Sequence, residues 1–418
     1  MLSPVNRVVH LELKVELAEA SINGILDWFW KQRGLLFEQI AGSLLEEAQR
    51  QWLEQVRAGT QEMICTGCGL VHTGAEGWVL RGRRTRRLKT LVGEVCLPLV
   101  QVTCGGCGRT RAPGTQILNL GAGAKMGAAL EQRALEQVCE TSYRRSARTL
   151  ASLAGVKVSS STLHRLVQRR AEQLELRADP QAEVVLADGT KVRAGGRAEL
   201  EELRMAIQVL GRETSEGRPR ARLRFLGLEV GLGGWPRVMQ PAPGTRVVVT
   251  DAELPVRAHV RNRYPGARHQ MCEWHIGHSL NWSLRVDGIP SAERKKRRAR
   301  LNRILWRDAP VEEKRREYDA FVESLGDSPT SQKQLRQARF YILFDLPSQE
   351  RTTSLLERQM REVDRRAWNG ARWSSRGLRN LLRLSFARTH NPDDYQRIWS
   401  AYPSTNPPGA SAPPMSTN

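Results

Sequence analysis

Two stretches decide the fold of this chain: VVLADGT at residues 184–190 and VVVTDAE at residues 247–253. Each begins as a run of apolar, mostly β-branched residues, which is typical of a buried strand, and each run meets an aspartate. We expect Asp188 at the end of its strand, immediately before a glycine turn, and Asp251 at the end of another strand. Asp before Gly is also a common turn signal, so either aspartate alone could do no more than end a strand.

The segments around these stretches predict a mixed sheet. Three strand patterns come in succession, a helix-sized gap follows, and a fourth strand closes the series; they cover residues 183–192, 204–210, 220–230 and 246–251. Residues 257–344 are mostly helical in pattern and strongly basic, and residues 352–390 predict a long amphipathic helix or a helix pair. The expected fold class is therefore multidomain α/β.

A third carboxylate is a candidate for the same sheet edge. Glu357 follows an apolar doublet in the helical pattern, so its side chain could face the two aspartates. Three carboxylates that converge at one edge could bind two divalent metal ions. Phosphoryl transfer between DNA strands needs little more than this from a protein. The alternative for Glu357 is an exposed residue paired with Arg361, four positions on.

The segment SARTLASLAGVKVSSSTLHRLVQRR at residues 146–170 has the rhythm of a helix-turn-helix. Gly155 permits the turn, and Ser159 or Ser160 can cap the second helix. The second helix would turn its polar side chains towards DNA; these are Ser161, Thr162, His164, Arg165 and Arg169. An ordinary pair of packed helices is the alternative.

Four of the seven cysteines form two C-x-x-C pairs, Cys65 with Cys68 and Cys104 with Cys107. Two such knuckles supply the four thiolates that a tetrahedral structural Zn²⁺ requires. The pattern predicts a zinc-ribbon-like module, with an unusually long spacer, that holds a basic loop at residues 81–89 against DNA. Cys96 and Cys139 are expected to be core thiols.

The formal net charge of +21 is clustered along the chain. Basic runs at residues 81–89, 144–170 and 294–307 could each neutralise several phosphates, and a solvated basic face is the alternative for any one of them. The candidate DNA-contacting residues in the first and last runs are Arg83, Arg84, Arg86, Arg87, Lys89, Lys295, Lys296, Arg297 and Arg298. No apolar run is long enough for a membrane span and no cleavable leader is evident, so we expect a cytoplasmic, nucleoid-associated protein.

Several short motifs, in this order and spacing, resemble the DDE transposases of bacterial insertion sequences, in the broad Mutator-like group. The motifs are DGT at residues 188–190, TD at residues 250–251, Cys-x-x-His at Cys272 and His275, and TSLLER at residues 353–358. WSSRG at residues 373–377 resembles the segment that follows the family's glutamate. Ser354 stands where that family usually has Asn, which leaves Glu362 as an alternative to Glu357.

This resemblance implies a ribonuclease H-like catalytic domain that cuts element ends and joins them to target DNA. Asp188, Asp251 and Glu357 would together hold two Mg²⁺ ions. The implied partner is double-stranded DNA, bound by a homodimer or higher oligomer. From the residues themselves, Cys272 and His275 read as a packed pair near the active site rather than a second metal site.

The domain organisation that we expect has five parts. A helical segment at 1–60 precedes the zinc-ribbon-like module at 61–115, the helix-turn-helix region at 126–178, the catalytic domain at 182–400 with a helical insertion at about 276–350, and a disordered tail at 401–418. Trp306 and Trp373 are candidates for stacking on an unpaired base. Two other functions stay open: a non-catalytic DNA-binding regulator, and a metal-dependent structure-specific nuclease.

Overall fold

The structure is a computed structural model that describes residues 21–117, 124–194, 200–215, 217–231, 234–347, 351–367 and 373–400. The expected tail at 401–418 and the first twenty residues of the expected helical segment lie outside the described residues. The chain divides into two compact units between Val167 and Gln168, and residues from Arg397 onward belong with the first. None of the described helices combines the length and apolar character that a bilayer crossing needs.

The first unit opens with one long helix, α1 (Ile22–Arg57), whose second half packs on strand β4 (Gly93–Cys104) through residues such as Leu45 and Trp52. Strand β3 (Trp78–Thr90) precedes β4, and β5 (Thr110–Arg111) completes a sheet of order β3-β4-β5. Two short strands, β1 (Met63–Ile64) and β2 (Val71–His72), pair separately, and the short helix α2 (Gly114–Ile117) follows β5.

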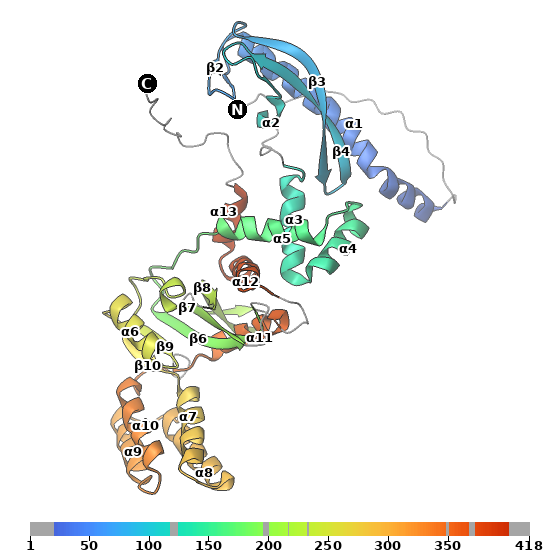
Figure 1. The fold of residues 1–418 in the computed structure, drawn as a ribbon. Helices are drawn as coiled ribbons and strands as arrows, with labels where there is room; N and C mark the ends of the chain where they lie inside the picture. Colours follow the sequence, from blue (N-terminus) through green and yellow to red (C-terminus); the bar gives the residue numbers. More distant parts are fainter. Residues whose placement is uncertain are drawn as a thin grey trace, which may run out of the picture. The chain divides into compact units, whose positions relative to one another are not determined.

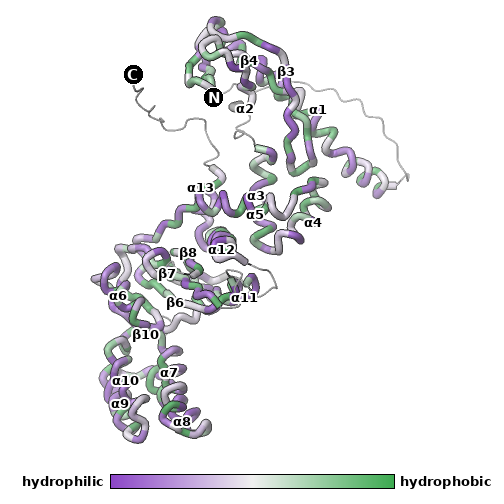
Figure 2. The backbone as a smooth tube through the Cα atoms, in the orientation of Figure 1, coloured by the Kyte–Doolittle hydropathy of each residue, from purple (hydrophilic) through white to green (hydrophobic). Residues whose placement is uncertain are grey.

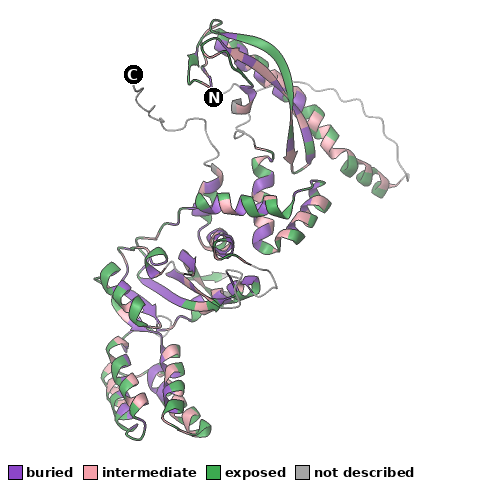
Figure 3. Cartoon of the chain, in the orientation of Figure 1, coloured by how far each residue is buried: buried purple, intermediate pink, exposed green. Residues whose placement is uncertain are grey.

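The prediction of a basic loop at residues 81–89 was wrong, because this run lies inside β3. Residues from Gly82 to Thr90 each have a partner on β4, and the only irregularity is a bulge between Leu80 and Gly82. Most of β3 is exposed, as Figure 3 shows by its colour. Pairing to the buried strand β4 therefore supplies the order that the basic sequence lacks on its own.

Three helices follow: α3 (Ala128–Glu140) and α4 (Tyr143–Ala154) in the first unit, and α5 (Ser160–Glu172), which crosses the division between the units. The predicted helix–turn–helix succession is present in α4 and α5. Gly155 ends α4 in the left-handed region at φ 66°, which a glycine adopts at little cost. Ser159 caps α5, since its Oγ accepts the N–H of Thr162 at 3.1 Å.

The second unit is built on a five-stranded sheet of order β10-β9-β6-β7-β8 (Figure 1). Strands β6 (Val184–Val192), β7 (Glu201–Ser215) and β8 (Arg218–Val230) form an antiparallel meander. Strand β9 (Val247–Thr250) runs parallel to β6, and β10 (Arg268–Met271) runs parallel to β9. The predicted mixed sheet is confirmed; β10, whose sequence RHQM carries no strand pattern, was not predicted.

Helices cover the sheet and continue from its edge. Between β8 and β10 the chain forms η1 (Trp235–Arg237) and α6 (Leu254–Arg263), which share a core cluster with the sheet. After β10 come α7 (Glu273–Val286), α8 (Ser291–Trp306), α9 (Val311–Glu323), α10 (Pro329–Ala338) and η2 (Arg339–Tyr341), packed around a core of their own. Hydrophilic and apolar residues alternate along these helices (Figure 2), as expected for a helical insertion with one buried face.

The remaining helices return the chain to the sheet. They are α11 (Ser354–Ala367), α12 (Ser375–His390) and α13 (Pro392–Ser400), so the segment predicted as a helix or helix pair is a pair. Helix α11 contacts β6, and α12 contacts β8. These contacts bring Glu357, in the first turn of α11, back to the strand that carries Asp188.

Candidate active site and metal centre

Asp188 lies within β6 and not at its end, so the predicted glycine turn is wrong. β6 continues through Gly189 to Val192 because β7 pairs with it along this whole length. The parallel partner β9, by contrast, ends at Thr250, and its last paired residue lies opposite Leu186. Asp188 therefore stands just beyond the point where the parallel pair stops, and it is 5% exposed.

Asp251 is the first residue after β9, two positions beyond the last paired residue, as Asp188 is on β6. Its Oδ1 accepts the N–H of Glu253 at 3.2 Å. The next residue, Ala252, has φ 58°, a left-handed conformation that costs a residue with a side chain about 1–2 kcal/mol. The N–H of Ala252 donates to Thr250 Oγ1 at 2.8 Å, which helps to hold this tight turn beside the carboxylate.

Glu357 reaches the same site through Thr353. The hydroxyl of buried Thr353 lies 3.0 Å from Asp188 Oδ2 and 3.3 Å from Glu357 Oε1, so one side chain contacts two of the three predicted carboxylates. The alternative glutamate, Glu362, instead pairs with Arg365 and Arg366 at 2.7 and 2.8 Å. Geometry therefore favours Glu357 as the third carboxylate of the cluster.

The first turn of α7 forms the wall behind Thr353. Cys272 is fully buried, and its Sγ accepts the N–H of Thr353 at 3.4 Å. The N–H of Glu273 donates to Arg351 O at 3.0 Å, and the buried guanidinium of Arg351 lies 3.4 Å from the Glu273 carboxylate. Burial raises the pKa of Glu273 to about 7, against the opposing charges of Arg351 and Lys314. This buried cluster ties the segment before α11 to the insertion.

His275, three residues after Cys272, lies with its Nε2 3.9 Å from Asp188 Oδ2. Burial lowers the pKa of His275, but its hydrogen bond with Cys272 and the negative charges of Asp188 and Asp251 outweigh burial and raise this pKa to about 9. The imidazole is thus protonated at neutral pH and places a positive charge beside the carboxylates. The predicted packed Cys–His pair is present at this position.

The carboxylates of the site repel one another in a partly dry environment. Burial raises the pKa of Asp188, and the charge of Glu357 raises it further while His275 opposes the shift. Burial likewise raises the pKa of Asp251, with added repulsion from Asp188 and Glu202. Such a group of desolvated, mutually repelling oxygen ligands is chemically suited to a hard divalent cation such as Mg²⁺.

Two further carboxylates belong to this neighbourhood and were not predicted. Glu202 lies on β7, opposite Lys191 of β6, and Glu253 follows Asp251 by two residues. Burial raises the pKa of Glu253, as do the charges of Asp251 and Glu202. The spacing of Glu253 from Asp251 was a visible signal, whereas nothing local to Glu202 distinguishes it from other charged strand residues.

The two C-x-x-C knuckles meet in the first unit. Cys65 Sγ lies 3.7 Å from Cys107 Sγ, and Cys68 Sγ lies 3.8 Å from Cys104 Sγ. Four sulfurs held at about 2.3 Å from a tetrahedral Zn²⁺ would be about 3.8 Å apart, so the thiols already have the size of that site. Among the described residues, this is the only set of three or more His, Cys, Asp or Glu side chains whose ligand atoms all lie within 4.8 Å of one another.

We call Cys65, Cys68, Cys104 and Cys107 together the cysteine centre. His72 lies beside this centre and was not predicted. It is 5% exposed, and its Nε2 lies 3.2 Å from Cys104 Sγ. A ring N–H that donates to a metal-bound thiolate stabilises the charged ligand and fixes its orientation. Burial raises the pKa of the Cys65 thiol, but the N–H groups of Gly67 and Cys68 outweigh burial and lower it to about 7.

The predicted DNA-contacting residues are spread over both units. On α5, Ser161, His164, Arg165 and Arg169 are exposed and Thr162 is half-buried. In β3, Arg83 pairs with Glu46 at 2.6 Å, and in α8, Arg297 pairs with Asp327 at 2.7 Å, so these two arginines are engaged within the protein. Lys295 and Lys296 are exposed and Arg298 is half-buried.

Of the remaining predicted side chains, Trp306 is 52% exposed at the end of α8. Trp373 donates its ring N–H to Arg366 O at 3.0 Å and is half-buried. Cys139 is buried as predicted, whereas Cys96 is only half-buried. No protein-family model matches this chain, and no curated protein matches it.

Proposed function

We propose that this chain is a metal-dependent DNA transposase that cleaves DNA at element ends and joins the cut end to a target. The observation that carries the proposal is that Asp188 and Asp251 both lie just beyond the end of the parallel pairing between β6 and β9, with Thr353 joining Asp188 to Glu357. Asp188 and Asp251 are 63 residues apart in sequence, and Glu357 follows Asp251 by another 106. Through Thr353, a carboxylate of the sheet is linked to a carboxylate of a helix that is distant in sequence.

A ribonuclease H-like fold for the second unit is part of this proposal. It is supported by the mixed sheet, by the order of the carboxylates along the chain, and by the helical insertion between the second and third of them. The first carboxylate lies in the first strand of the meander, the second follows the strand parallel to it, and the third lies on α11.

The site's own residues would act by position and charge. Asp188, Asp251 and Glu357 would hold Mg²⁺, while Thr353 fixes the orientation of two of them. When bound, Mg²⁺ would stabilise negative charge on the phosphoryl oxygens and would activate the attacking water or hydroxyl. Protonated His275 opposes the rise in the pKa of Asp188 and would place positive charge where a phosphodiester approaches. Double-stranded DNA as partner fits the net charge of +21 and the exposed polar face of α5.

The test is an assay with Mg²⁺ on a labelled duplex that carries the gene's own flanking DNA, together with a target plasmid. Wild-type protein should release a cut end and join it to the target. The Asp251→Asn and Glu357→Gln variants should lose the joined product by at least about a thousandfold, several kcal/mol of transition-state stabilisation.

Glu362→Gln is the matched control, because Glu362 lies on the same helix as Glu357 but pairs with Arg365 and Arg366. It should keep the joining activity. Cleavage without any joined product would favour the structure-specific nuclease, and tight binding without cleavage by the folded wild-type protein would favour the non-catalytic regulator. Equal loss in Glu362→Gln and Glu357→Gln would contradict the assignment of the third carboxylate.

A further inference from the structure

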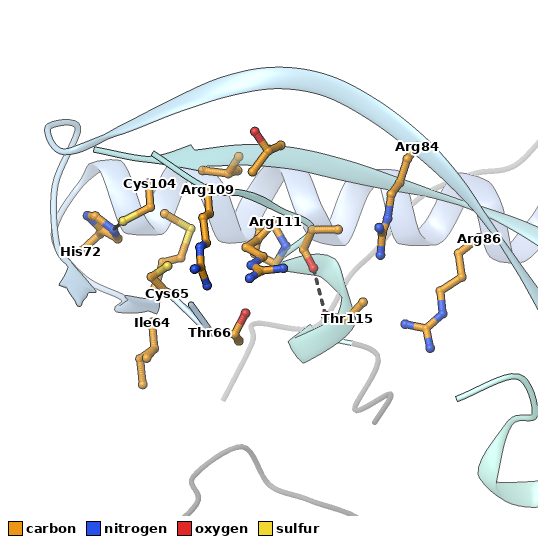
Figure 4. Close-up of a pocket in the computed structure, with 15 residues that line it drawn as sticks. Ile64, Cys65, Thr66, His72, Arg84, Arg86, Cys104, Arg109, Arg111 and Thr115 are labelled. Carbon is orange, nitrogen blue, oxygen red and sulfur yellow. Dashed lines mark hydrogen bonds between the residues drawn. The ribbon is translucent and has the colours of Figure 1, made fainter. Parts of the chain in front are cut away.

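A cavity of about 220 Å³ lies beside the cysteine centre, beneath the strands of the first unit (Figure 4). Four arginines contribute to its wall: Arg84, Arg86, Arg109 and Arg111. Figure 4 shows Arg84 and Arg86 coming from β3, and Arg109 and Arg111 coming from the second knuckle and β5. The described residues that line this cavity include no aspartate or glutamate. We call the cavity with these four arginines the arginine pocket.

The arginines of the basic run in β3 therefore lie on two different faces of the strand. Adjacent residues of a strand point to opposite faces, so Arg84 and Arg86 share a face, and Arg83 and Arg87 share the other. Only the first pair lines the cavity. Arg83 instead forms an ion pair with Glu46 of α1.

Three of the four pocket arginines have no ionic partner among the described residues. Within the described chain, Arg84, Arg109 and Arg111 form no ion pair or side-chain hydrogen bond, and Arg86 donates to Ala124 O at 2.7 Å. Burial lowers the pKa of Arg86, and the charge of Arg84 lowers it further. An anion would relieve this repulsion, and guanidinium groups match phosphate oxygens in a bidentate geometry.

The cysteine centre accounts for only part of this charge. A Cβ atom on Gly67, in the turn of the first knuckle, would lie 3.4 Å from Arg109 Cδ and 3.5 Å from Arg111 Nη2. These two arginines therefore lie against the knuckle, where they can offset the excess negative charge of four thiolates around Zn²⁺. The charge of Arg84 is then not offset within the described chain, which favours an external anion.

We propose that the arginine pocket binds one backbone phosphate of double-stranded DNA, so that the cysteine module anchors the duplex by its backbone and not by its bases. This inference deepens the proposed function and rests on it for the identity of the ligand. Phosphate contacts fix the register of a protein on DNA without reading sequence. The pocket should therefore bind duplexes of unrelated sequence equally well.

The experiment uses the full-length, zinc-loaded protein in buffer without Mg²⁺ and without chelator, so that the duplex stays intact and zinc stays bound. Binding to a labelled duplex is measured by fluorescence anisotropy at several salt concentrations. Arg84→Gln/Arg111→Gln is compared with wild type and with Arg83→Gln/Arg87→Gln, which removes the same charge outside the cavity. The pocket variant should bind about tenfold more weakly, and its slope of log affinity against log salt should fall by about one, as expected for one lost phosphate.

An equal fall in both double variants, or no fall in the pocket variant, would overturn the proposal. Loss of zinc from the pocket variant with an unchanged salt slope would also overturn it, since the arginines would then serve only the cysteine centre. If the double variant does not fold, Arg84→Gln against Arg84→Lys gives the same test, because lysine keeps the charge and should keep the slope.

Two further measurements distinguish a failure of the pocket proposal from a failure of the proposed function. Inorganic phosphate is titrated against the wild-type protein; tight binding of free phosphate that leaves the duplex affinity unchanged would assign the pocket to a small anion and overturn the DNA assignment. Strand joining is measured in parallel with the wild-type protein. Absent joining with an intact pocket effect would reject the transposase and keep the DNA pocket, and the reverse result would reject only the pocket.

Discussion

Several residues of the candidate site are held in states that they would not adopt if exposed to water. Asp188 is buried beside other carboxylates, which raises its pKa, and protonated His275 is buried among negative groups. Ala252, between Asp251 and Glu253, has a left-handed backbone conformation although it is not a glycine. Strain and charge repulsion concentrated in one place are typical of a functional site.

We predict that Asp188→Asn stabilises the metal-free protein. Because burial, and then repulsion from Glu357, raise the pKa of Asp188, its ionised form at neutral pH lowers the stability of the fold. A neutral amide removes this cost, and Tm without added Mg²⁺ should rise by about 2–4 °C. Differential scanning calorimetry in the presence and absence of Mg²⁺ measures both effects.

The same variant should lose the increase in Tm that Mg²⁺ gives the wild-type protein, since a ligand of the folded state stabilises it by mass action. Glu362→Gln serves as control and should keep that increase, because its carboxylate lies outside the cluster. An Mg²⁺ response of unchanged size in Asp188→Asn would remove Asp188 from the metal site.

At the scale of elements, the site depends on how the segment before α11 is attached to the first turn of α7. The attachment consists of the Glu273 N–H to Arg351 O hydrogen bond, the Arg351–Glu273 ion pair and the contacts of Thr353 with Cys272. Arg351 also donates to Leu305 O at 2.6 Å, which adds α8 to the same joint. The helical insertion thus positions Glu357 without supplying any of the three carboxylates.

We predict that Arg351→Met destabilises the protein by about 3–5 kcal/mol, because it leaves the buried Glu273 carboxylate without its partner. The folded-state pKa of Glu273 is already raised above its unfolded value, so its favourable contribution is present at low pH and is lost as pH rises through about 7. The loss in Arg351→Met should therefore be larger at pH 8 than at pH 5. Urea denaturation at the two pH values measures it.

The double variant Glu273→Leu/Arg351→Met is the control, since it removes both charges and should recover most of the stability. Equal destabilisation at the two pH values would show that Arg351 acts through packing alone. Strand joining by the double variant reports separately on whether the ion pair also positions Thr353.

At the scale of the whole molecule, the two compact units carry different chemistry. The first unit holds the cysteine centre and the arginine pocket, and the second holds the carboxylate cluster. A zinc site contributes directly to folding when its ligands come from loops with little core of their own. The two knuckles flank short strands, β1, β2 and β5, of two residues each.

We predict that the protein unfolds in two thermal transitions, of which only one depends on zinc. Removal of zinc with a strong chelator, or the change Cys104→Ser, should lower the first Tm by more than about 10 °C and leave the second within about 2 °C. Calorimetry with metal analysis, which should find one zinc per chain, is the measurement. Cys139→Ser is the matched control and should keep the zinc. A single transition that shifts as a whole on chelation would contradict the prediction.

Local patterns in the sequence determined where several strands, one turn and the cysteine pairs lie. Apolar runs marked β6 and β9, glycine and serine marked the turn between α4 and α5, and paired spacing marked the four cysteines. Each of these signals lies within a few residues, because strand alternation, helix capping and knuckle turns are short-range effects. The resemblance in the short motifs added Asp188, Asp251 and Glu357 as a proposed set of metal ligands.

Only the tertiary structure decided which residues meet. Thr353 contacts Asp188 across 165 positions of sequence, His72 lies against Cys104, and Glu202 enters the carboxylate neighbourhood from β7. The same holds for the basic run at 81–89, which looked like a loop until its pairing with β4 made it a strand with two different faces. Sequence patterns encode local conformation, whereas the partners of a buried polar group are chosen by the packing of distant elements, and no short-range pattern records that choice.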